Sequence, residues 1–243
     1  MAVGSGDCPD LRALCEHIGD CHRCPLGSTR TQVVFGSGDP RAELMFVGEA
    51  PGRNEDLEGA PFVGAAGRFL DELLQSIGLE RSQVYIANVV KCRPPGNRDP
   101  LPLEIETCTP FLRRQMELIA PRVVATLGRF SAHWLLDTEV PISALRGRLY
   151  HVGDIRVVPV FHPAAALYDA SKRDVLFEDF KRLRAVCDDR RDGATSASAQ
   201  TPEAPLASGA APAVQDRQPA DLSDPASEAP GLSHGDPSQG ALF

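Results

Sequence analysis

The strongest constraint on the fold is a regular alternation between Arg41 and Cys187, where short apolar runs are followed by segments with helical periodicity. Short runs rich in Val and Ile are typical of buried strands. Strands that alternate with amphipathic helices predict an α/β fold, in which helices cover both faces of a parallel sheet. The four strands that we predict are Glu43–Gly48, Val84–Val90, Val123–Leu127 and Arg156–Phe161.

Three apolar stripes at three- and four-residue spacing predict amphipathic helices. The first should end at Gly78, and the second contains Pro110, which we expect to kink or restart the helix. The residues of the three stripes, in chain order, are Phe69, Leu70, Leu73, Leu74 and Ile77; Ile105, Cys108, Leu112, Met116 and Ile119; and Phe177, Phe180, Leu183 and Val186.

Composition divides the 243 residues into a folded domain, 1–187, and a tail, 188–243. The tail is rich in Ala, Pro, Ser and Gly and shows no apolar periodicity, so we expect it to be disordered. Its nine acidic residues outnumber three arginines and supply most of the net charge of −8. The folded part is nearly neutral, and the acidic pI therefore does not argue against a nucleic-acid partner.

Four of the seven cysteines, Cys21, Cys24, Cys92 and Cys108, have the layout of a four-thiolate metal site. A zinc ribbon usually brings two close pairs, whereas here only the first pair is close, so an iron–sulfur cluster fits the spacing better. His22 is an alternative ligand. Scattered cysteines indicate a reducing compartment, and neither a signal peptide nor a membrane-spanning run is recognisable, so we expect a cytoplasmic protein.

Three segments with chemical character lie at the ends of predicted strands: Gly48–Gly52 (GEAPG), Asn88–Lys91 and His162–Pro163. Ligands of open α/β sheets bind beyond the carboxyl ends of the strands, where these segments should meet. GEAPG lacks the spacing and the lysine of a phosphate-binding loop. The sequence therefore predicts a ligand site of another kind at this edge.

Four motifs occur in order along the chain: GEAPGRNED at Gly48–Asp56, PFVGAAG at Pro61–Gly67, NVVKCRPPGNRDP at Asn88–Pro100 and HPAA at His162–Ala165. Together they resemble a known family, the iron–sulfur uracil-DNA glycosylases of family 4. The resemblance runs from about Cys21 to Phe180 and includes the four cysteines. It implies a three-layer α/β/α fold with a central four-stranded parallel sheet, a [4Fe–4S] cluster, and excision of uracil from DNA that leaves an abasic site.

The residues of these motifs suit that reaction. An asparagine amide can complement the N3 donor and O4 acceptor of uracil, so we expect Asn88 to read the base. The base must leave the stack and enter a pocket, where Phe62 would cover it and the small Ala50 would lie beside it. A phenylalanine that only fills the core is the alternative for Phe62.

Cleavage of the glycosidic bond leaves positive charge on the sugar and negative charge on uracil. By the resemblance, Glu49 would position or activate the water and His162 would stabilise charge at uracil O2. Glu55 and Asp56 are the alternative carboxylates, and a solvated acidic turn is the other interpretation of these two residues.

The expected partner is uracil-containing DNA, single- or double-stranded, bound by a monomer. Local cations attract phosphates, and apolar side chains can fill the gap left by a flipped base. The residues that we predict to contact DNA are Lys91, Arg93, Arg98, Leu167, Tyr168, Lys172 and Arg173.

Two further expectations concern the protein's partners. A related family traps uracil-DNA covalently through a histidine near the third cysteine, but no histidine lies between His22 and His133, which favours turnover over trapping. The alternative is a non-turnover uracil-DNA-binding or scaffold iron–sulfur protein in a repair or replication assembly, and the presence of Glu49, Asn88 and His162 together argues against it. The chain ends in QGALF, in which Gln239, Leu242 and Phe243 resemble the short motif that docks bacterial repair proteins on the sliding clamp.

Overall fold

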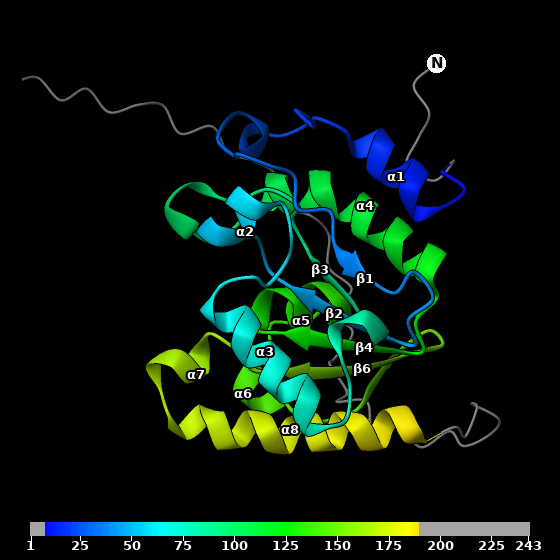
Figure 1. The fold of residues 1–243 in the computed structure, drawn as a ribbon, viewed down its shortest axis with the longest axis vertical. Helices are drawn as coiled ribbons and strands as arrows, with labels where there is room; N and C mark the ends of the chain where they lie inside the picture. The colour runs from blue at the N-terminus through cyan, green and yellow to red at the C-terminus, as the bar shows by residue number, and fades with distance from the viewer. Residues whose placement is uncertain (1–7, 190–243) are drawn as a thin grey trace, which may run out of the picture. The chain divides into compact units, whose positions relative to one another are not determined.

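The computed structural model describes residues 8–189, and in this part of the chain helices pack against both faces of one sheet (Figure 1). The strands are β1 (Ser37–Gly38), β2 (Leu44–Gly48), β3 (Tyr85–Asn88), β4 (Val123–Leu127), β5 (Tyr150–Val152) and β6 (Ile155–Val160). The α-helices are α1 (Leu11–Ile18), α2 (Arg53–Glu58), α3 (Ala65–Ser76), α4 (Pro102–Ile119), α5 (Arg129–Leu136), α6 (Ile142–Leu145), α7 (Ala165–Tyr168) and α8 (Ser171–Asp188). Short 3₁₀ turns are η2 (Pro25–Ser28), η3 (Arg81–Gln83) and η4 (Pro95–Asn97).

The sheet is mixed and has six strands, in the order β1-β3-β2-β4-β6-β5. Its inner strands β3, β2, β4 and β6 pair in parallel and coincide with the four predicted segments. The expectation of a four-stranded parallel sheet is corrected by β1 and β5, which pair antiparallel at the two edges. Both edge strands are short and not fully buried, so they lack the apolar run that predicts a strand.

Alternate side chains of the inner strands enter two separate cores, as the two-residue period of a strand requires. Met45 and Val47 pack with α1 and α4, whereas Leu44 and Phe46 pack with α3 and α8 on the opposite face. The two helix pairs lie on opposite sides of the sheet in Figure 1. The three layers leave the carboxyl ends of β2, β3 and β6 open to form a site.

The predicted helices correspond to α3, α4 and α8. Gly78 follows α3 with a positive φ of 70°, which glycine adopts without strain. Pro110 does not restart α4, which runs through it as one helix. The missing proline N–H leaves the Glu106 carbonyl without its usual donor, and the hydroxyl of Thr109 donates to that carbonyl at 3.5 Å.

None of the helices between residues 8 and 189 has the length and apolar character required to cross a bilayer. The predicted tail begins at the end of α8, which stops at Asp188. Residues 190–243, with Gln239, Leu242 and Phe243, lie outside the described residues.

Candidate active site

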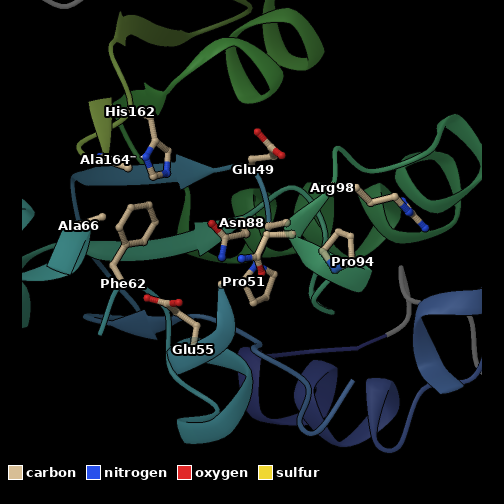
Figure 2. Close-up of a pocket in the computed structure, with 13 residues that line it drawn as sticks. Glu49, Pro51, Glu55, Phe62, Ala66, Asn88, Pro94, Arg98, His162 and Ala164 are labelled. Carbon is tan, nitrogen blue, oxygen red and sulfur yellow. Dashed lines mark hydrogen bonds between the residues drawn. The ribbon is translucent and has the colours of Figure 1, made fainter. Parts of the chain in front are cut away.

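A pocket of about 360 Å³ opens where β2, β3 and β6 end (Figure 2). It brings together the three segments that the sequence predicts to meet, with Glu49 after β2, Asn88 at the end of β3 and His162 after β6. The lining residues are Glu49, Ala50, Pro51, Gly52, Glu55, Phe62, Ala66, Asn88, Pro94, Asn97, Arg98, His162 and Ala164.

Asn88 lines this pocket and carries an unpaired hydrogen-bonding atom. Its side chain is 2% exposed, and within residues 8–189 no donor reaches its Oδ1. Buried polar atoms are nearly always paired, so an unpaired carbonyl oxygen at a pocket wall indicates a ligand that donates to it. Gly48 makes room for this amide, because a Cβ there would lie 2.3 Å from Asn88 Oδ1 and 2.9 Å from the Phe62 ring.

Phe62 and His162 form an aromatic wall. Their ring centroids are 5.5 Å apart and their planes differ by 26°. Phe62 is only 6% exposed, and its backbone has a φ of 55°, which is rare for a bulky residue. Figure 2 shows both rings beside Asn88.

His162 is a neutral imidazole at physiological pH. Burial lowers its pKa to about 4, and the nearby carboxylate of Glu55 opposes this shift only in part. The backbone N–H of Ala164 donates to Nδ1 at 3.1 Å, so the single proton of the neutral ring lies on Nε2. The ring can therefore donate one hydrogen bond from Nε2 without carrying a positive charge.

The pKa of Glu49 is shifted in the opposite direction to that of His162. Burial raises its pKa to about 7, the negative charge of Asp99 adds to this effect, and the positive charge of Arg129 opposes it. Arg129 and Asp99 form an ion pair of 2.5 Å. Neither residue was singled out from the sequence, because nothing in the spacing of Asp99 and Arg129 predicts their approach to Glu49.

The two alternative carboxylates have other partners. Glu55 lines the pocket, but its Oε1 accepts the backbone N–H groups of Val63 and Gly64 at 3.0 and 3.1 Å. Asp56 is buried and accepts the backbone N–H of Thr31 at 2.9 Å. Asp56 is not among the residues that line the pocket, so its position does not fit the activation of water there.

Lys91 does not lie on the DNA-facing surface that the sequence indicated. Its side chain is 1% exposed, and its Nζ donates to the Asn88 carbonyl oxygen at 2.9 Å and to Gln115 Oε1 at 2.5 Å. A buried ammonium cannot contact a phosphate of bound DNA. Lys91 instead holds the end of β3 from within the core, directly behind the base-reading candidate Asn88.

The remaining predicted DNA contacts lie on two sides of the pocket. Arg93 donates to Asn97 Oδ1 at 2.7 Å, and Arg98 lines the pocket while it pairs with Glu104 at 2.7 Å. Asn97 was not predicted as a site residue, although it forms part of the lining.

The second side of the pocket is the segment after His162. On α7, Leu167 is 48% and Tyr168 91% exposed, which suits side chains that enter DNA. Lys172 pairs with Asp169 at 2.8 Å and Arg173 with Glu72 at 2.5 Å, so each cation already has a carboxylate partner.

All four predicted metal ligands line one small apolar cavity on the face of the sheet covered by α1 and α4, together with Ile18, Val33, Lys91, Thr107 and Phe111. In the described part of the chain, no three or more metal-binding side chains converge closely enough to hold a single metal ion. His22 is not part of the cavity lining and lies 3.2 Å from Asp20. Burial raises the pKa of Cys92 to about 12 and also raises that of Cys108.

A family model and several similar proteins relate this chain to the uracil-DNA glycosylases. The family model described as "Uracil DNA glycosylase superfamily" matches residues 35–184, which include the sheet and the pocket. The Type-4 uracil-DNA glycosylase of Archaeoglobus fulgidus is 48% identical over 185 residues, covering 73% of this chain and 93% of that relative. The proteins of the same name from Sulfurisphaera tokodaii and Thermotoga maritima are 49% and 41% identical, cover 72% of this chain each, and are themselves covered to 84% and 93%.

Proposed function

The chain belongs to the uracil-DNA glycosylase superfamily and is a type-4 uracil-DNA glycosylase, and from this premise we propose that the pocket at the strand ends is its active site. The enzyme hydrolyses the bond between uracil and deoxyribose in DNA. The observation that carries the assignment of the pocket is the unpaired, buried Oδ1 of Asn88 beside the aromatic wall of Phe62 and His162.

Asn88 reads the base. Its Oδ1 accepts the N3–H of uracil, and its NH₂ donates to O4. Cytosine offers an amino group where uracil has O4, so two donors would face each other. Phe62 covers the base, and the small Ala50 leaves room beside it. A base must be flipped out of the duplex, or taken from a single strand, to reach these groups.

His162 stabilises the negative charge that develops on the departing uracil. A neutral Nε2–H donates to O2 at any pH well above 4, the value to which burial lowers the pKa of His162. A neutral donor also leaves the site free of a cation that would repel the positive charge on the sugar.

Glu49 acts on the water. Its ionised carboxylate orients the nucleophile and stabilises the positive sugar, and a pKa of about 7 makes it a base suited to neutral pH. Glu55 is better suited to hold the loop of Phe62, because it accepts two N–H groups at Val63 and Gly64.

The residues that line the cavity of Cys21, Cys24, Cys92 and Cys108 fit a [4Fe–4S] cluster. Each thiolate of such a cluster binds its own iron, so the four sulfurs need not converge on one point as they would around zinc. The cluster would pin these elements together and take no part in base hydrolysis, which requires no electron transfer.

A monomer of the enzyme binds DNA along the two sides of the pocket. The cations near the phosphates are Arg93, Arg98, Lys172 and Arg173. Leu167 and Tyr168 fill the gap left by the flipped base. Through QGALF, at the end of a tail of about fifty residues with a reach of about 40 Å, the enzyme would bind the sliding clamp.

The direct test is incubation of limiting enzyme with an oligonucleotide that carries one uracil, followed by alkali. Strand cleavage beyond one equivalent of enzyme is the expected result. Persistent uracil strands held in a tight complex would contradict turnover and favour the alternative, a binding or scaffold protein.

A further inference from the structure

The backbone of Phe62 is held in a conformation that a phenylalanine does not adopt on its own. Its φ of 55° lies in the left-handed region, which is unusual for a bulky side chain and persists only where neighbours fix it. The direction of the ring follows from the backbone, so the groups that fix residue 62 also fix the aromatic wall.

Arg81 makes the contacts that fix it. Its NH2 donates to the Pro61 carbonyl at 2.6 Å, and its NH1 donates to the Phe62 carbonyl at 2.9 Å. The same NH1 pairs with Asp71 on α3 at 2.9 Å. A planar guanidinium is the side chain suited to bind two consecutive carbonyls and a carboxylate at once.

Two other groups complete the support of this turn. Glu55 accepts the N–H groups of Val63 and Gly64, the two residues that follow Phe62. Helix α3 approaches so closely that a Cβ at Gly67 would lie 1.7 Å from the Phe62 carbonyl oxygen. Arg81 therefore connects α3, the turn and η3, from which the chain continues into β3 and Asn88.

We propose that Arg81 is a positioning residue of the active site, which acts through Phe62 by fixing the two carbonyls of its turn. This inference rests on the proposed role of Phe62 as the ring that covers the base. Arg81 itself does not line the pocket, so its effect on the reaction must pass through the turn. Arg81 differs from a residue that only stabilises the fold, because the loss of Arg81 should reduce the rate of excision more than the affinity for DNA.

The first measurement uses Arg81→Met, which keeps an apolar stem and removes the guanidinium. Single-turnover excision should fall on the order of 10- to 100-fold, the range for misplacement of a binding group by a distant change. The dissociation constant for DNA that carries an abasic site should stay unchanged, because no base enters the pocket. Arg81→Lys keeps the positive charge but lacks the planar guanidinium that binds two carbonyls at once. The excision rate of this variant should therefore lie between those of Arg81→Met and the wild type.

Arg114→Met is the matched control. Arg114 also donates twice to a backbone carbonyl, that of Cys8, and also pairs with a carboxylate, Glu117, at 2.8 Å. Its partners are not pocket residues, so this variant should keep the wild-type excision rate even if its melting temperature falls.

A double-mutant cycle with Phe62→Leu decides the inference. If Arg81 acts through the ring, Arg81→Met should slow the wild type but add little to Phe62→Leu. Full additivity of the two losses would overturn the role of Arg81 and leave that of Phe62 intact. A wild-type rate in Phe62→Leu would overturn both. If Arg81→Met fails to fold, Arg81→Lys provides the same cycle and the same two contradicting outcomes.

Discussion

Burial shifts the pKa values of Glu49 and His162 in opposite directions. Burial disfavours charge, so it lowers the pKa of His162 to about 4 and raises that of Glu49 to about 7. The histidine is thereby kept as a neutral donor and the glutamate as a base near neutrality. Separated pKa values of this kind assign the two roles.

The rate of single-turnover excision should therefore rise with pH through about 7 and then level off. Glu49 must be ionised to act on the water, and its pKa is raised, so activity is lost as pH falls through that value. His162 contributes no change there, because it stays neutral well above its pKa of about 4. The measurement is a rate profile under single-turnover conditions.

Asp99→Asn removes the negative charge that raises the pKa of Glu49, so the midpoint of this profile should move to lower pH. Asp154→Asn, in the exposed turn between β5 and β6, is the control and should leave the midpoint unchanged. A profile that stays flat through neutrality would contradict the role of Glu49.

At the scale of the elements, the pairing of parallel strands explains why the site could be located from sequence. The carboxyl ends of β2, β3 and β6 lie at one edge, so residues far apart in the chain meet there. The loss of a contact between two helices away from this edge should therefore lower the free energy of unfolding without altering the chemistry of the pocket. The contact between α6 and α8 provides such a case.

Arg146, which follows α6, donates to both carboxylate oxygens of Asp179 on α8 at 2.8 and 2.6 Å, and Asp179 is fully buried. Arg146→Met should lower the free energy of unfolding by about 1.5–3 kcal/mol, because it removes both hydrogen bonds to a buried carboxylate and leaves it only the more distant Arg182, at 3.7 Å. Arg184→Met, which breaks the exposed pair with Asp188, should cost only about 0.3–0.5 kcal/mol. Urea titration measures both, and equal losses would contradict the account.

The sequence predicted the four inner strands because each is a continuous apolar run, and it missed β1 and β5 because neither is. It predicted Glu49, Asn88 and His162 because they lie at the ends of strands. The surface position predicted for Lys91 was incorrect, since sequence does not show that its side chain turns into the core. Arg81 gave no signal, because its partners are backbone carbonyls at Pro61 and Phe62, which no side-chain pattern marks.

At the scale of the whole molecule, the cysteine cavity should hold the cluster that ties distant segments together. Purified protein should be yellow-brown and contain iron and sulfide. Cys92→Ala should lose the colour and lower the melting temperature, whereas Cys187→Ala, a cysteine outside the cavity, should change neither. A colourless, active preparation with stoichiometric zinc and no iron would remove this claim.

The chain end should matter for recruitment and not for chemistry. Deletion of Gln239–Phe243 should abolish binding to the sliding clamp and leave excision from free oligonucleotides unchanged, because the pocket lies within residues 49–164. Clamp affinity can be measured with the purified clamp by surface binding or calorimetry. Equal clamp affinity in the truncated and the full-length protein would contradict the role of QGALF in recruitment.

We expect Asn88 and His162 to carry out base recognition and excision in one pocket. These two roles are tested by the single-turnover rate of uracil excision by Asn88→Ala and His162→Ala. His133→Ala, whose ring contacts the Val140 carbonyl at 2.9 Å, is the control. Each pocket variant should be slower by roughly 10²–10³-fold, as for the loss of a preorganised donor, and His162→Ala should still bind DNA. Full rates in both pocket variants would contradict the account.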